Sequence, residues 1–326
     1  MRSLTSKNRT RKLKSKKNAL KVRVSHLNLP VGLKKGDSLA LIRPATKIDK
    51  DKWEASIRDL RAAGYFVLVY PGSFREDTYF SASDDERAKE FDWAMREPAA
   101  KAVLCCRAGY GSMRMIARIR SSQIKKWRPK IIMGYSDITY LHAWIHNQLK
   151  WPSFHGPLMG FLNAIEISQS LGNLMDLAGK KREELWAEVE ILNEGEASGN
   201  LYGGNLSLIQ ADGPAALPRR PMILAVEDVN EDWYRLDRMV WSLIQSGYGE
   251  YVKGIIVGTL EGCGKKDSEN FGVKKFQESL KALSSGPIWW GGNFGHGLKV
   301  QRILALGLRV KMTKEKILHY LEPAVR

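Results

Sequence analysis

The pattern that most constrains this chain is the alternation of short apolar runs with segments of helical spacing. Apolar runs at 37–42, 65–70, 102–106 and 130–133 have the length of buried strands. Residues 49–63 and 84–95 lie between such runs and repeat apolar side chains every three or four positions, as helices do. Strands that alternate with helices favour a mostly parallel sheet covered on both faces. The sequence therefore predicts an α/β fold.

The same alternation resumes in the second half of the chain, after a polar stretch. Strands are expected at 221–226, 253–260 and 287–290, with a helix over 234–244. A single core rarely grows much beyond about 250 residues, so 326 residues predict two domains. We place the first domain at 37–170, a linker at 171–197 and a smaller α/β domain at 198–326.

Most of the net charge of +17 lies in one segment. Residues 1–36 contain twelve Lys or Arg and no acid, which leaves +5 for the rest of the chain. Such a run is typical of a flexible, solvated arm, with weak binding of a polyanion as the lesser alternative. Nucleic acid is otherwise not expected as a partner.

Several classes of protein are disfavoured by what the sequence lacks. It contains no run of about 18 apolar residues and no apolar region after the basic start, which argues against a membrane span and a secretory signal. The cysteines Cys105, Cys106 and Cys263 suggest no disulfide framework and favour a reducing, cytoplasmic location. Metal-ligand spacings do not occur, and we expect neither a metal nor a cofactor.

A glycine-rich turn follows the third predicted strand and ends in a serine, over Arg107-Ala108-Gly109-Tyr110-Gly111-Ser112. A serine between a strand and a helix can present its hydroxyl on a sharp turn, with the next backbone N–H positioned to stabilise an oxyanion. Ser112 is therefore the predicted nucleophile, although the pattern alone also fits a phosphate-binding turn or a helix N-cap.

A serine nucleophile needs a base, and the base needs an orienting acid. His296 lies in a glycine-flanked loop after a predicted strand, where α/β active sites form, and His155 is the competing histidine. Glu227 follows the apolar strand 222–226 directly, and its neighbour Asp228 stays an alternative acid at this level.

Together these segments resemble the LD-carboxypeptidase family, which includes the microcin-C immunity peptidases. Residues 107–114 are similar to the family's RGGYGS-x-R nucleophile motif, and 80–87 to its FAGTDEER-like segment. Further matches follow in the family's order at 134–139, 155–157, 203–208, 226–228, 234–238 and 294–297. The resemblance covers roughly residues 37–315.

The resemblance implies a flavodoxin-like first domain and a Ser112–His296–Glu227 triad at the junction with the second. It also implies oxyanion donors at the backbone of Met113 and Ala82, where Ala82 and Ala108 replace glycines of the family. The expected reaction is release of terminal D-alanine from murein tetrapeptide in peptidoglycan recycling, by a cytoplasmic enzyme that is commonly a dimer. Candidates for substrate contacts are Arg107, Arg114, Tyr110, Ser136 and Asp137.

Two other functions remain open at this level. The same triad could hydrolyse a peptidyl-nucleotide of the microcin-C type, with a nucleobase stacked on Trp233, Trp241, Trp289 or Trp290. A polyanion-binding protein that uses the basic arm is the alternative from another class.

Overall fold

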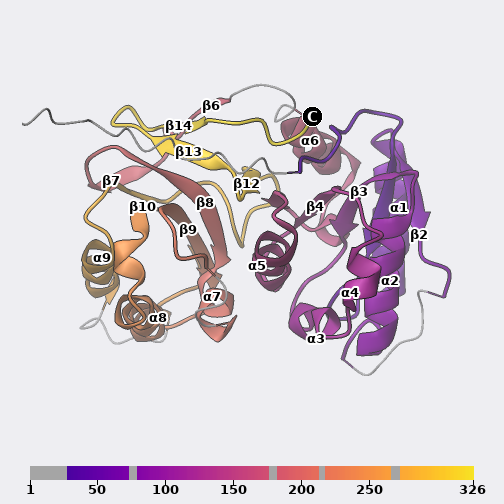
Figure 1. Cartoon of the computed structure of the whole chain (residues 1–326), viewed down its shortest axis with the longest axis horizontal. Coiled ribbons are helices and arrows are strands. Elements are labelled where there is room, and N and C mark those ends of the chain that lie inside the picture. The colour runs from indigo at the N-terminus through magenta and orange to yellow at the C-terminus, as the bar shows by residue number, and fades with distance from the viewer. Residues whose placement is uncertain (1–27, 73–78, 176–181, 213–216, 266–271) are drawn as a thin grey trace, which may run out of the picture.

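The chain folds around two sheets that lie side by side (Figure 1). The computed structural model describes residues 28–72, 79–175, 182–212, 217–265 and 272–326. Most of the basic arm therefore lies outside the described residues, and its predicted flexibility stays a prediction. Among the described residues, no helix combines the length and apolar character that crossing a bilayer requires.

The first sheet has the strand order β2-β1-β3-β4-β5-β12. Its strands are β1 (Ser38–Ile42), β2 (Phe66–Val69), β3 (Ala100–Cys105), β4 (Ile131–Gly134), β5 (Ser153–His155) and β12 (Leu304–Leu306). The first five are parallel and β12 runs antiparallel to β5. The order 2-1-3-4-5 is that of flavodoxin-like, doubly wound sheets, so the predicted fold class is confirmed.

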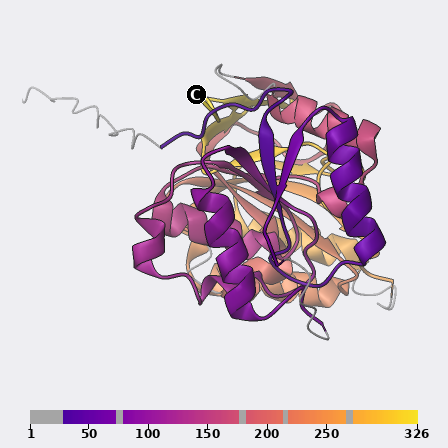
Figure 2. The ribbon, with the colours of Figure 1, turned by 90° about the vertical axis from the view of Figure 1, so that its right-hand side faces the viewer.

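Helices cover both faces of this sheet, as Figure 2 shows for α1 and α2. They are α1 (Lys50–Ala62), α2 (Asp84–Arg96), α3 (Ser112–Ile116), α4 (Ser121–Ile124), α5 (Ile138–Leu149), α6 (Ala164–Met175) and the 3-10 turn η1 (Met159–Phe161). In β1, Leu39 and Leu41 pack in the cluster that contains α1 and α6 side chains, whereas Ala40 and Ile42 pack with those of α2 and α5. Alternate strand residues thus fill two cores.

The second sheet has eight strands in the order β6-β14-β13-β8-β9-β10-β11-β7. They are β6 (Glu183–Leu185), β7 (Glu190–Asn193), β8 (Ala197–Asn205), β9 (Met222–Val229), β10 (Val252–Glu261), β11 (Ile288–Trp290), β13 (Arg309–Met312) and β14 (Ile317–Tyr320). Its helical elements are α7 (Leu206–Asp212), α8 (Trp233–Gln245), α9 (Gly272–Leu283) and η3 (Tyr248–Glu250). Side chains of α8 and α9 pack with those of β9 and β10 in one cluster.

The two halves share one hydrophobic core. Leu41 and Met133 of the first sheet belong to the same buried cluster as Ile223 and Ile256 of the second. The chain also returns from the second half to the first sheet, because β12, which lies beyond residue 300, pairs with β5. This continuous packing fixes the first sheet's edge against the loops of the second half.

The stretch 171–197 is more ordered than the plain linker we predicted. It contributes the end of α6 and the whole of β6 and β7, which are the two edge strands of the second sheet. Their polar composition fits edge strands, which are short and often charged. The interpretation of this stretch as a linker only is therefore wrong.

Candidate active site

A sharp turn joins β4 to α5 at the carboxyl edge of the first sheet and presents Ser136. The backbone of Ser136 has φ +64°, a left-handed conformation that non-glycine residues rarely adopt. Gly134 permits the turn, because a Cβ there would lie 2.9 Å from the Ile138 side chain. Strained serines on strand-to-helix turns are a recurring way to expose a reactive hydroxyl.

The imidazole of His296 faces this serine. Its Nε2 lies 3.2 Å from Ser136 Oγ, and its Nδ1 lies 2.6 Å from Glu227 Oε2. The backbone N–H of His296 also donates to Glu227 Oε2, at 3.3 Å. Gly295 has φ +112°, and a Cβ there would lie 2.7 Å from Glu227 Cβ. Glycine at 295 thus lets the histidine loop lie directly on the carboxylate.

Burial and charge act in opposite directions on the imidazole. Burial alone would lower the pKa of His296, but the hydrogen bond and negative charge of Glu227 outweigh it and raise that pKa above its ordinary value. Glu227 is completely buried, and its Oε1 has no hydrogen-bond partner among the described residues. The carboxylate therefore has His296 as its main electrostatic partner in the described structure.

The alternatives for base and acid occupy other environments. Asp228 accepts hydrogen bonds from Asn205, from Ser207 and from the Val229 backbone, which ties it to the start of α7. His155 is fully buried, and burial lowers its pKa to about 3. Neither side chain makes a hydrogen bond to a predicted catalytic residue among the described contacts.

The expected contact between Ser112 and His296 is absent from the described structure. Ser112 is completely buried, and its hydroxyl donates to the backbone carbonyl of Asp137 at 2.7 Å. Its N–H donates to Asp137 Oδ2 at 2.8 Å. These two bonds hold the start of α3 against the Ser136 turn. Among the described contacts, the hydroxyl within hydrogen-bonding distance of the imidazole is that of Ser136, and the role of Ser112 as nucleophile stays a prediction.

From the sequence, Ser136 is predicted only as a substrate contact. The signal that identifies it is the same strand–turn–helix context used for Ser112, since it follows the run 130–133 and precedes an apolar helix.

A buried arginine holds the loops around Ser112 together. Arg87 donates from Nε to the carbonyl of Ala82 at 3.1 Å, and from one terminal nitrogen to the carbonyls of Pro44 and Gly111 at 2.6 and 2.7 Å. Its other terminal nitrogen pairs with Asp84. Ala82, predicted as an oxyanion donor, therefore uses its carbonyl to anchor this arginine. Its N–H is not assigned a role by these contacts.

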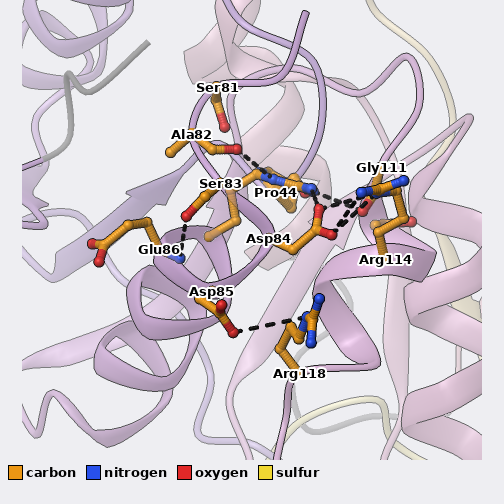
Figure 3. A network of polar contacts seen from close by, with 12 residues as sticks. Pro44, Ser81, Ala82, Ser83, Asp84, Asp85, Glu86, Gly111, Arg114 and Arg118 are labelled. Carbon is orange, nitrogen blue, oxygen red and sulfur yellow. Dashed lines mark hydrogen bonds and ion pairs between the residues drawn. The ribbon is translucent and has the colours of Figure 1, made fainter. Parts of the chain in front are cut away.

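The predicted substrate-binding arginines differ in their surroundings. Arg114 donates from Nε to both oxygens of Asp84 at 3.1 Å, which Figure 3 shows beside the Asp85–Arg118 pair. Arg107 lies with its guanidinium 5.9 Å from the Phe161 ring and has no ion pair among the described residues. Of the two, Arg107 is the one left with donors for an anionic ligand.

Two further predicted residues lie near the same edge. Tyr110 is 46% exposed, and its N–H donates to Thr46 Oγ1 at 3.1 Å. Met113 is the second residue of α3 and is half-buried.

In the described part of the chain, no three His, Cys, Asp or Glu side chains are arranged to hold a metal ion.

The fold and the site define a class of protein: a two-domain α/β protein with a hydroxyl, an imidazole and a buried carboxylate in series. Such a series can move a proton from the hydroxyl to the imidazole, which is the first requirement of nucleophilic catalysis by serine.

Comparison with known proteins identifies the family. The model of the LD-carboxypeptidase N-terminal domain matches residues 39–156, and that of the C-terminal domain matches residues 198–312. A probable murein peptide carboxypeptidase of Bacillus subtilis is 31% identical over 82% of this chain and 86% of its own length. The murein tetrapeptide carboxypeptidase of Pseudomonas aeruginosa is 27% identical, over 79% and 88%.

Solved structures agree with this assignment. Muramoyltetrapeptide carboxypeptidase from Oxalobacter formigenes superposes with a TM-score of 0.74 at 26% identity, covering 88% of this chain and 99% of that one. The microcin C7 self-immunity protein MccF has a TM-score of 0.79 at 21% identity, over 91% and 99%, and shares the fold. The chain belongs to the LD-carboxypeptidase family, and with it to the peptidases.

Proposed function

We propose that this chain is a serine carboxypeptidase that releases the terminal D-alanine of murein tetrapeptide, with Ser136 as nucleophile. One observation carries the proposal: the hydrogen-bonded series from Ser136 Oγ through His296 to the buried Glu227. The names of the Bacillus and Pseudomonas relatives support the substrate class. A cytoplasmic homodimer that acts in peptidoglycan recycling is part of the same proposal.

The reaction proceeds in two steps. The N–H at Nδ1 of His296 donates a hydrogen bond to the Glu227 carboxylate, which leaves Nε2 as the acceptor for the Ser136 proton. Ser136 Oγ attacks the amide carbonyl before the terminal D-alanine, and His296 passes the proton to the departing amine. Water then attacks the resulting ester, His296 takes the proton of the water, and Ser136 regains it.

With Ser136 as the proposed nucleophile, the expected oxyanion donor is a different backbone N–H. The backbone N–H of the residue after the serine supplies this donor in strand-to-helix turns, which makes it Asp137 here instead of Met113. The positive end of α5 adds to the field at the same place. Ser112 supports this N–H, because its two hydrogen bonds hold the side-chain carboxylate and the backbone carbonyl of Asp137.

Arg107 is the proposed partner of the terminal carboxylate of the substrate. Arg107→Gln is expected to raise KM and lower kcat/KM by about 10- to 100-fold, since a charged hydrogen bond contributes about 1.5–3 kcal/mol. The measurement compares the tetrapeptide with its C-terminal amide. We expect the native enzyme to lose activity on amidation and the Arg107 variant to be insensitive to it.

Arg114→Gln is the matched control, because Arg114 is already paired with Asp84. It should keep the native preference for the free carboxylate. If the Arg107 variant kept that preference and the Arg114 variant lost it, the assignment of the carboxylate site would be reversed.

The peptidyl-nucleotide alternative has less support in the structure. Trp289 is buried in the shared core, and Trp233 and Trp290 pack against the core of the second half. Of the four tryptophans considered for nucleobase stacking, only Trp241 is substantially exposed, at 44%.

Incubation with murein tetrapeptide, followed by mass spectrometry for loss of one alanine, tests the proposed substrate directly. A Ser136→Ala sample is the blank, and no loss with the native enzyme would refute this substrate.

The pH dependence of kcat/KM follows from the raised pKa of His296. The base must be neutral in the free enzyme, so activity falls as the pH drops through the pKa of this imidazole. Because Glu227 raises that pKa, we expect the acid limb to have its midpoint above about 6.5, the ordinary value for histidine. A pH–rate profile with tetrapeptide measures it, and a midpoint clearly below 6.5 would contradict the assigned base.

A further inference from the structure

A polar cavity lies at the opposite edge of the first sheet from Ser136. Its volume is about 250 Å³, and it is formed by the end of α2, the start of β3 and the residues before β4, together with Val31 and the last residue of the chain. Ser136 follows the carboxyl end of β4, whereas Lys130 precedes its amino end. The cavity is therefore separate from the peptidase site.

Cationic side chains dominate its lining. They are Arg96, Lys101, Lys126, Arg128, Lys130 and Arg326, and no Asp or Glu lines the cavity. Among the described residues, only Arg96 of these six has an ion pair, with Asp92. The backbone carbonyl oxygen of Arg326 accepts the Gly32 N–H at 3.0 Å, which holds this residue beside the cavity.

The most buried of these cations is Lys130, which is 7% exposed. Its ammonium donates to the carbonyls of Ala94 and Glu97 at the end of α2. Burial, with Lys101 as a nearby like charge, lowers the pKa of Lys130 to about 8. Asp92 and Glu97 lie beside Arg96 and Lys130, but six cations line the cavity, and converging like charges destabilise a fold unless an anion offsets them.

We propose that this cavity is a binding site for a phosphate group. Its volume is below the roughly 300–1,000 Å³ of sites for drug-sized ligands, which favours one compact anionic group. The planar guanidiniums of Arg128 and Arg326 offer paired donors that match phosphate oxygens, and lysines act as point charges beside them. The phosphate can belong to a small molecule or to a nucleic-acid backbone. This site is independent of the proposed peptidase mechanism.

The test measures binding of sodium pyrophosphate and of a twelve-residue oligothymidylate to the full chain by calorimetry. The variant Lys101→Gln/Lys126→Gln/Arg128→Gln removes three cations from the cavity. The matched control Lys253→Gln/Lys281→Gln/Lys314→Gln removes three exposed cations from the second half, with the same change in net charge. Both variants should keep peptidase activity, which shows that they fold.

We expect the cavity variant to bind pyrophosphate at least tenfold more weakly than the native chain, and the control within twofold of it. If the oligonucleotide is the physiological type of ligand, its binding should show the same difference. The slope of log K against log salt should then become shallower by up to about 2, because each of the three lost phosphate contacts contributes about 0.7 to it. Equal weakening in both variants, or no binding of either probe at low salt, would overturn the proposal.

Discussion

Ser136→Ala is expected to lower kcat on murein tetrapeptide by a factor of about 10⁶, the loss seen when a serine nucleophile is removed from a triad. The nearby Ser112 cannot replace it, because its hydroxyl already donates to the Asp137 carbonyl and is completely buried. The measurement is single-turnover hydrolysis followed by mass spectrometry. Binding of the substrate should be largely retained, since Ser136 contributes to the reaction step.

Ser112→Ala is the control that separates the two serines. It removes the hydroxyl bond to Asp137 and keeps the backbone N–H bond to the carboxylate of that residue. A hydrogen bond contributes about 1 kcal/mol net, so we expect a loss of about fivefold in kcat. If Ser112→Ala were as inactive as a chemical blank while Ser136→Ala kept activity, the nucleophile would be Ser112.

Glu227→Gln is expected to lower kcat by about 10⁴, the effect of neutralising the orienting acid of a triad. The amide nitrogen of glutamine can donate to Nδ1 of His296, which would place the imidazole proton on Nε2, facing Ser136. The residual acid limb of kcat/KM should also move to lower pH, because the negative charge that raises the pKa of His296 is gone.

The neighbouring Asp228→Asn variant tests whether the effect belongs to Glu227 alone. Asp228 holds Asn205 and Ser207, so this change should lower Tm. Its negative charge also helps to raise the pKa of His296, but less than Glu227 does, so we expect a smaller shift of the acid limb to lower pH than in Glu227→Gln. A shift of the limb by Asp228→Asn, with none by Glu227→Gln, would assign the orienting acid to Asp228.

Much of this site was accessible from the sequence because strand ends are visible as breaks in apolar runs. Glu227 directly follows such a run, and His296 lies in a glycine-rich loop after another. The structure joins them at 2.6 Å, as the family resemblance implied. The choice between Glu227 and Asp228 depended on which way each side chain points, and alternate residues of a strand face opposite sides.

The choice between Ser112 and Ser136 as nucleophile is not accessible from the sequence in the same way. Ser112 and Ser136 both follow strands of the first sheet and precede helices, and the sequence pattern does not report backbone dihedral angles. Only the left-handed φ of Ser136 and the direction of the Ser112 hydroxyl separate them. The edge strands β6 and β7 were missed for another reason, since short polar strands depend on their neighbours for pairing.

Covalent labelling tests the identity of the nucleophile most directly. A fluorophosphonate probe reacts with an activated serine, and trypsin separates the two candidates, because Ser112 lies in fragment 108–114 and Ser136 in fragment 131–150. Each fragment contains a single serine. We expect the adduct mass on fragment 131–150, and its loss in Ser136→Ala. An adduct on fragment 108–114 of the native enzyme would contradict the proposed active site.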